Sequence, residues 1–329
     1  MAVVVPVAHA SLLDRLRRFN YAPLLALLVL VAISAVMSEP FRSVGNALNI
    51  LRQASYFGIV ALGMTFVIIG GGIDLSVGSM LALVGYVAIW ALNSMTGGIG
   101  PEASQAWPVV AAAVAAVALG AALGLANGLA IAVGRIAPFI VTLGTLAIFR
   151  SMALYLADAG ELRSVNAVYG DMGASRILGV PTPIWVFIGL AVLLDLLLHR
   201  TRYGRHVCAV GSSERVAQFS AVAVHKVRTL TYVIAGATVA VSAVFWSART
   251  NSINSTNFGQ GEELNAIAAV IIGGTPINGG RGSVWGTVVG AVMLQIINNM
   301  LNMMSVSPYL QGTVKGLVII VAALIQRRL

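Results

Sequence analysis

The sequence predicts an all-α, polytopic membrane protein with about ten transmembrane helices and both termini in the cytoplasm. Of its 329 residues, 58% are hydrophobic and only 9% are charged, and the mean hydropathy is +0.91. This composition excludes an ordinary soluble domain. Long apolar runs fill most of the chain, so we expect a single transmembrane domain over residues 1–329.

The net charge of +9 would suggest an acidic partner, but most of the basic residues lie in clusters beside apolar runs. Such clusters mark the cytoplasmic ends of membrane spans. They therefore indicate contact with membrane lipid, and no nucleic-acid partner is expected. The chain has one cysteine, Cys208, so an intrachain disulfide is impossible.

The spans are assigned from the N-terminus onward. Arg15, Arg17 and Arg18 precede the first apolar run, Ala22–Met37. A signal peptide begins in the same way, but this run is long and further spans follow, so a retained helix is expected. Residues 38–55 are polar and predict an interfacial lead-in outside the membrane. The other expected spans are about 56–69, 75–92, 108–133, 138–157, 184–198, 229–248, 264–274, 284–304 and 309–325, before Arg327 and Arg328.

The connections between these spans differ in charge. Residues 93–107 contain no Lys or Arg and are expected outside, as are 158–183 and the polar stretch 249–263. Residues 158–183 are also long enough to hold a short surface helix that meets a partner. The connection at about 199–228 is rich in Arg and Lys, which predicts a cytoplasmic loop.

Two of the expected spans are interrupted. Near Gly70–Asp74, three glycines loosen the helix, and Asp74 is a lone carboxylate in a long apolar stretch. A charge at such depth costs about 2.5–3.5 kcal/mol and marks a functional site by default. Broken backbone at membrane depth must face protein or a water-filled cavity. This stretch is therefore a candidate wall of a path through the bilayer.

The second interruption is expected near Gly273–Gly282, because Val67–Gly71 recurs there as Val270–Gly274. Paired interruptions in two halves of a transporter point to its central site. The symmetry relation between the two copies stays open.

Small residues recur every fourth position in the span at 108–133, at Gly120, Gly124 and Gly128. Such spacing lets helices approach closely and predicts a packing role. Asn127 in the same span either makes a packing hydrogen bond or lines the path.

Two motifs, Gly71–Ser79 and Ile271–Gly286, closely resemble those of the ribose-type permease family, the membrane subunits of bacterial ABC importers for monosaccharides and similar small polyols. The resemblance extends from about Asn46 to Arg328. It implies a location in the bacterial inner membrane, a second permease subunit (an identical or a related chain), a cytoplasmic ABC ATPase and a periplasmic sugar-binding protein. It also implies a translocation subunit that is not an enzyme.

Independently of the resemblance, the sequence contains no phosphate-binding loop of the Gly-x-x-x-x-Gly-Lys-Ser/Thr type. No cofactor or metal site is expected on this chain, and ATP and Mg belong on the partner ATPase.

In the family, a short helix in the large cytoplasmic loop docks into a groove on the ATPase. The matching segment here is Ala209–Val222, with a Ser cap and apolar residues to insert. The alternative is an ordinary positively charged cytoplasmic loop. The family favours Asn before this helix and Ser-Gly-Ile after it, where this chain has other residues. The candidate coupling residues are Gly211, Ser213, Glu214, Arg215, Ala217 and Phe219.

The sugar path is expected to be modestly polar, since a passing sugar needs transient hydrogen bonds and a tight site would trap it. Asp74 has a second possible role as a cap of the following helix. Both roles stay open, as do the identity of the sugar and the choice between a homodimer and a heterodimer of permeases. The candidate path residues are Asp74, Ser76, Ser79, Asn278, Asn298 and Asn299.

Two other classes of function are alternatives to an ABC permease. A proton-coupled secondary sugar transporter would use Asp74 and Asp195 as proton carriers and would need no ATPase. An intramembrane enzyme is disfavoured, because the chain has no His-Glu-x-x-His or Gly-x-Ser-x-Gly motif and its four histidines lie outside the expected spans.

Overall fold

The computed structural model describes residues 22–97 and 104–326 of the chain. The basic residues predicted to mark the two cytoplasmic ends, at 15–18 and 327–328, lie outside the described residues. The helices are α2 (Ala22–Met37), η1 (Pro40–Arg42), α3 (Val44–Ile69), α4 (Val77–Met95), α5 (Ala106–Ala132), α6 (Pro138–Leu156), α7 (Ala167–Ala174), α8 (Thr182–Arg200), α9 (Arg202–Ser212), α10 (Glu214–Phe219), α11 (Val224–Thr250), α12 (Glu262–Ile272), α13 (Val284–Met303) and α14 (Pro308–Gln326).

Four short strands complete the described part: β1 (Glu161–Arg163), β2 (Arg176–Ile177), β3 (Val180–Pro181) and β4 (Ser252–Asn254). β1 pairs antiparallel with β4, with Leu162 opposite Ile253, and β2 pairs antiparallel with β3. These small sheets join loops, so the predicted all-α class is correct.

Seven of the described helices are long and apolar enough to cross a membrane: α3, α4, α5, α6, α8, α11 and α13. The chain is therefore a multi-pass membrane protein. The other three expected spans coincide with α2, of 16 residues, α12, of 11 residues, and α14. The total of about ten spans and the cytoplasmic position of both termini stay predictions.

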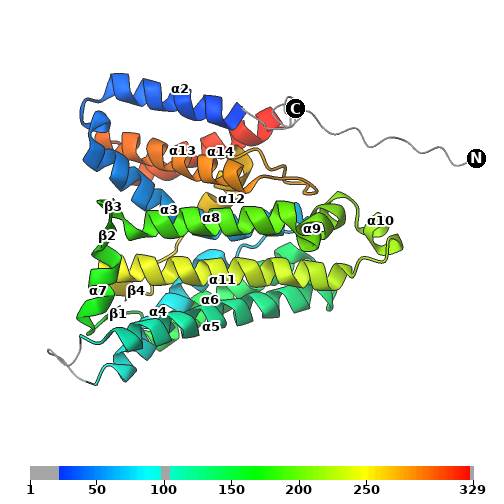
Figure 1. Ribbon diagram of the computed structural model, residues 1–329, viewed down its shortest axis with the longest axis horizontal. Helices are drawn as coiled ribbons and strands as arrows, with labels where there is room; N and C mark the ends of the chain where they lie inside the picture. The colour runs from blue at the N-terminus through cyan, green and yellow to red at the C-terminus, as the bar shows by residue number, and fades with distance from the viewer. Residues whose placement is uncertain (1–21, 98–103, 327–329) are drawn as a thin grey trace, which may run out of the picture.

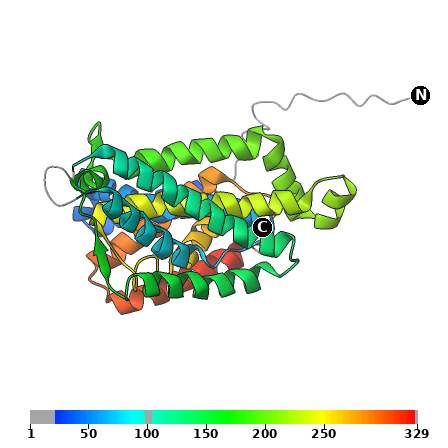
Figure 2. The same cartoon turned by 90° about the horizontal axis from the view of Figure 1, so that it is seen from below.

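The helices run side by side, as Figure 1 and Figure 2 show. The short strands and α7 lie at one end of this bundle, and α9 and α10 lie at the opposite end. α3 occupies the centre: it is buried from Ala54 to Ile69 and packs against α8, α11, α12 and α13.

Residues 38–55 are mostly helical, and most of residues 42–53 are exposed or half-buried, so the expected interfacial lead-in stays a prediction. α3 begins at Val44, and the side chain of Ser43 caps it by accepting a hydrogen bond from the Asn46 amide (3.2 Å). Asn46 and Asn299 then join α3 to α13 through two side-chain hydrogen bonds of 3.1 and 2.8 Å. The polar residues of this stretch thus form the first turns of α3, and the later turns from Ala54 onward are buried.

The predicted short helix in residues 158–183 is present as α7, packed against α11. Its Tyr169 is buried, and the hydroxyl lies 2.7 Å from the Ser247 hydroxyl. Whether α7 meets a partner stays a prediction.

The packing role predicted for the small residues of α5 is confirmed. A Cβ atom on Gly120 would collide with the Gly236 carbonyl of α11, and one on Gly124 would collide with the Tyr232 carbonyl. Farther along, Thr229 donates a hydrogen bond to the Gly128 carbonyl (3.2 Å). α5 and α11 are therefore in backbone contact along this line, as small-residue interfaces allow.

We expect Gly120→Leu to destabilise the protein strongly, by about 3 kcal/mol or more, because no side-chain movement can remove a clash with backbone. Thermal unfolding of the purified protein in detergent measures the effect. Gly144→Leu is the matched control, since a Cβ atom at Gly144 of α6 meets nothing within 4 Å and the position is exposed. Equal midpoints for the two variants would contradict this packing.

Candidate functional site

The first predicted interruption lies between the end of α3 at Ile69 and the start of α4 at Val77. Asp74 in this break is 0% exposed, and its Oδ1 accepts hydrogen bonds from the Ser76 amide (2.9 Å) and the Ser76 hydroxyl (2.6 Å). The carboxylate is folded back onto the turn that leads into α4, whose N-cap is Ser76 and not Asp74, so both predicted roles of Asp74 stay predictions. Its Oδ2 has no hydrogen-bond partner among the described residues.

Two other helices hold this break in place. Asn127 of α5 is fully buried and donates a hydrogen bond to the Ser76 hydroxyl (2.9 Å). Tyr232 of α11 donates a hydrogen bond to the Ile73 carbonyl (3.3 Å). In this structure Asn127 therefore makes the packing hydrogen bond that was one of its two predicted roles.

The second interruption lies between the end of α12 at Ile272 and the start of α13 at Val284. It meets the first directly: the Gly280 amide donates a hydrogen bond to the Ile69 carbonyl (2.8 Å). Gly279 has φ +77 and Gly280 has φ +80, a conformation that glycine adopts at little cost. The two breaks are thus joined through their backbones.

The end of α9 touches both breaks at the same place. A Cβ atom on Gly211 would collide with the Ile69 carbonyl and with the Gly280 amide nitrogen. Beside it, the Ser212 hydroxyl lies 3.5 Å from the Gly280 carbonyl. We call this meeting of Ile69, Gly211 and Gly280 the three-way contact. Sequence analysis proposed Gly211 for coupling but gave no sign that it touches the breaks.

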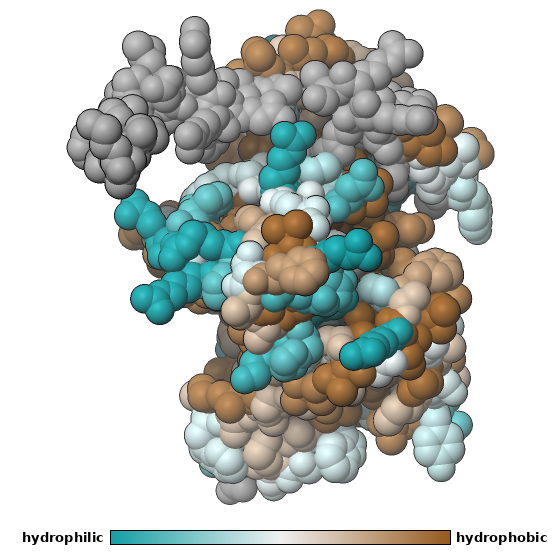
Figure 3. Space-filling model, turned by 90° about the vertical axis from the view of Figure 1, so that its right-hand side faces the viewer, coloured by the Kyte–Doolittle hydropathy of each residue, from teal (hydrophilic) through white to brown (hydrophobic). Residues whose placement is uncertain are grey.

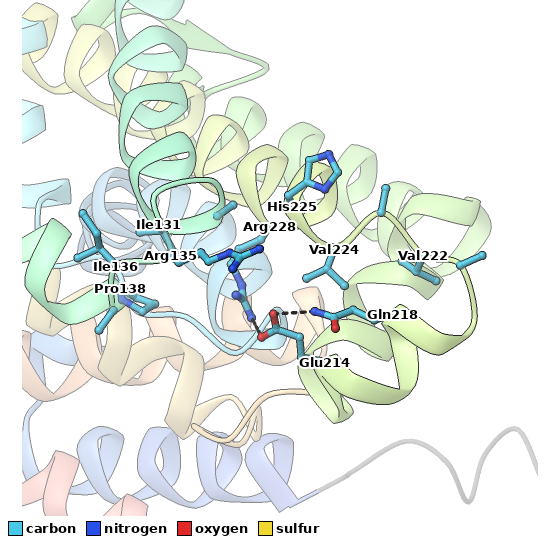
Figure 4. A pocket seen from close by; sticks show the side chains of 14 residues that line it. Ile131, Arg135, Ile136, Pro138, Glu214, Gln218, Val222, Val224, His225 and Arg228 are labelled. Carbon is cyan, nitrogen blue, oxygen red and sulfur yellow. Dashed lines mark hydrogen bonds and ion pairs between the residues drawn. The ribbon is translucent and has the colours of Figure 1, made fainter.

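α10 follows immediately after the three-way contact. Ser213 is its N-cap, as predicted, and its side chain accepts a hydrogen bond from the Val216 amide (3.4 Å). Glu214 pairs with Arg228 of α11 (2.8 Å) and accepts a hydrogen bond from Gln218 (3.3 Å), as Figure 4 shows. These contacts hold α10 against the start of α11.

The apolar side chains of α10 face two ways. Phe219 and Val216 are 86% and 62% exposed, whereas Ala217 is 2% exposed and packs inward. Of the candidate coupling residues, Ala217 therefore faces the protein itself, whereas Phe219 faces outward. Arg215 is exposed. Figure 3 views this end of the molecule and shows hydrophilic side chains gathered across it.

The predicted path residues are brought together only in part, because Asp74 and Ser76 are hydrogen-bonded whereas the three asparagines lie elsewhere. Ser76 and Ser79 are buried at the start of α4, while Asn278 is exposed in the turn of the second break. Asn299 is held by Asn46, and Asn298 of α13 donates a hydrogen bond to Gln295 (3.4 Å). Their role in a path stays a prediction.

Sequence analysis missed a set of charges inside the bundle. Arg150 lies near the middle of α6, and its guanidinium donates hydrogen bonds to the carbonyls of Ser255 (2.9 Å) and Phe258 (3.0 Å). Glu263 follows in the first turn of α12, and a Cβ atom on Gly78 would collide with its carboxylate. Glu262 precedes it, with Lys315 of α14 close enough to interact electrostatically.

Residues 249–263, which are expected outside, pack in part against the bundle, and their side of the membrane stays a prediction. After β4 the chain turns back into the bundle, where Phe258 packs on Trp246 (ring centroids 4.8 Å apart) and Gly259 packs on the Gly78 carbonyl. The charges of Arg150 and Lys315 inside expected spans were visible in the sequence and carried the same signal as Asp74. The positions of Glu262 and Glu263 could not be predicted in this way, because both residues belong to a polar stretch of sequence in which glutamates are ordinary.

Residues 46–323 match the family described as branched-chain amino acid transport system / permease component. The chain is 40% identical over 308 residues to the ribose import permease protein RbsC of Bacillus subtilis (strain 168), covering 93% of this chain and 92% of the relative.

Two relatives from Escherichia coli (strain K12) are also similar over most of their length. The D-allose transport system permease protein AlsC is 34% identical, with 94% of this chain and 91% of the relative covered. The L-arabinose transport system permease protein AraH is 30% identical, with 94% and 90% covered. No solved structure matches this chain.

Proposed function

Because the chain belongs to the branched-chain amino acid transport system / permease component family, we propose that it is the membrane permease subunit of an ABC importer for a monosaccharide or similar small polyol. The family description names amino acids, but the relatives above are permeases for ribose, D-allose and L-arabinose. Similarity over more than nine-tenths of the chain to three sugar permeases supports a sugar as the transported solute. The bacterial inner membrane is its proposed location.

The proposed partners are the other subunits of such an importer. ATP and Mg bind a separate cytoplasmic ATPase, a periplasmic binding protein delivers the sugar, and a second permease subunit completes the path. The three-way contact carries this proposal, since α10 presents Phe219 and Val216 outward while the adjoining end of α9 touches both interrupted helices. A movement of α10 on its ATPase therefore acts on both breaks at once.

The sugar path requires polar groups at membrane depth. The proposed path residues Asp74, Ser76 and Ser79 are buried at the first break, so a sugar reaches them only after the break opens. Arg150 extends this proposal, because a charged side chain within a span faces the bundle interior or a water-filled cavity. Glu263 extends it as well, because its carboxylate lies against Gly78 beside the first break. Their carboxylate and guanidinium groups are suited to brief hydrogen bonds with sugar hydroxyls.

Proton-coupled secondary transport remains the alternative. Its two proposed carriers have local partners in this structure: Asp74 is bonded to Ser76, and Asp195 lies 3.0 Å from His199. These contacts favour structural roles and therefore the ATP-driven importer.

Uptake into vesicles separates the two functions. We expect vesicles holding the permease with its ATPase and binding protein to accumulate sugar only with ATP and to keep doing so when an uncoupler removes the proton gradient. Radiolabelled ribose, allose and arabinose serve as substrates. Uptake by the permease alone, abolished by the uncoupler and by Asp74→Asn, would establish the secondary transporter instead.

We expect Phe219→Asp to weaken association with the ATPase by at least about tenfold, since it places a charge where an exposed aromatic side chain would be buried. Co-purification and titration of the ATPase in detergent measure the loss. Leu178→Asp is the matched control, because Leu178 is 89% exposed in the β2–β3 turn at the opposite end. Unchanged ATPase binding by Phe219→Asp would show that α10 does not dock there.

A further inference from the structure

A cavity of about 970 Å³ lies between α10 and the turn that joins α5 to α6. Arg135, Ile136 and Pro138 form one wall, and Glu214 and Arg228 lie across from them, as Figure 4 shows. The cavity is placed where two membrane-crossing helices end, because α5 stops at Ala132 and α6 starts at Pro138. Nothing in the sugar path or in the outward face of α10 uses it.

The lining of the cavity carries more positive than negative charge. Arg228 is paired with Glu214 (2.8 Å), whereas Arg135 makes no ion pair with any residue that the structure describes. His225 adds a third basic side chain to the wall. The start of α6 also lines the cavity, and a helix N-terminus favours an anion. The charge balance therefore fits an anionic group.

The backbone at Arg135 points to a role for its side chain. Its φ is +55, in the left-handed region that glycine adopts freely and that costs other residues about 1 kcal/mol or more. The neighbouring Gly134 does not take this conformation, and the arginine does. Arg135, held in this conformation, lines the cavity.

Exposed apolar side chains adjoin the cavity. Val133 and Ile136 are 63% and 44% exposed in the turn, and Phe139 and Ile140 are 59% and 62% exposed in the first turn of α6. In a membrane-crossing helix, side chains of this kind contact acyl chains. Cationic cavities of this kind, between helices at the membrane boundary, suit lipid headgroups.

α10 itself argues against an ATPase segment as the occupant. Glu214 and Gln218 face the cavity, whereas Val216 and Phe219 are exposed and do not line it. The surface proposed for the ATPase is thus a different face of α10. An occupant of the cavity would lie between α10 and the bundle.

We propose that this cavity binds the phosphate headgroup of an anionic phospholipid, whose acyl chains lie along the exposed apolar side chains of α6. Arg135 supplies the free positive charge, and Arg228 adds to it while holding Glu214. Because Glu214 belongs to α10, a bound lipid also stabilises the position of that helix. This proposal rests on the cavity and its charged residues, and it does not depend on which solute the protein carries.

Native mass spectrometry of the full-length chain in detergent tests the site, with phosphatidylglycerol and phosphatidylcholine of identical acyl chains as probes. We expect a preference for phosphatidylglycerol that Arg135→Gln reduces about fivefold, the effect of one cation near a membrane surface. Arg135→Lys keeps the charge and should keep most of the affinity. Lys226→Gln is the matched control, because Lys226 is exposed beside His225 but does not line the cavity.

Three results would overturn the proposal. The first is an equal loss of phosphatidylglycerol with Arg135→Gln and Lys226→Gln, which would indicate a diffuse surface charge. The second is displacement of the lipid by an equal concentration of inorganic phosphate, which would indicate a soluble ligand. The third is an Arg135→Gln variant that binds lipid as before but associates more weakly with the ATPase, which would assign the cavity to the interface with that protein. Unfolding midpoints of all variants establish that each is folded.

Discussion

Direct backbone contact between three segments far apart in the sequence is the constraint on which this structure depends. Ile69 ends α3, Gly280 lies in the second break, and Gly211 lies in the last turn of α9. No side chain lies between them, since a Cβ atom on Gly211 would collide with backbone atoms of the other two. Such a contact has no flexible group that could absorb a displacement, so the segments must move together or separate.

The rest of the bundle limits which of these segments can move. α3 is enclosed by α8, α11, α12 and α13, and its far end is tied to α13 by Asn46 and Asn299. The first break is held by Asn127 and Tyr232. By contrast, α10 lies at the end of the bundle (Figure 1) and presents Val216 and Phe219 outward, where a partner reaches it.

Much of this architecture could be predicted from the sequence, because its causes are local. Glycine runs and a buried carboxylate mark the breaks, a serine marks the start of α10, and small residues at every fourth position mark the contact of α5 with α11. The Asn46–Asn299 pair, the return of residues 255–263 into the bundle and the three-way contact could not be predicted. Each depends on residues that only the folded chain brings together, and hydrophobic periodicity carries no information about such pairs.

The most direct test of this account is Gly211→Ala in the transporter reconstituted with its ATPase and binding protein, with ATP hydrolysis and sugar uptake measured on the same vesicles. A single methyl group in the three-way contact forces the segments apart at a cost of about 1–3 kcal/mol. The account predicts that the ATPase still binds and hydrolyses ATP while sugar uptake falls by about tenfold or more. Uptake and hydrolysis both equal to those of the unaltered protein would show that the contact does not couple the two processes.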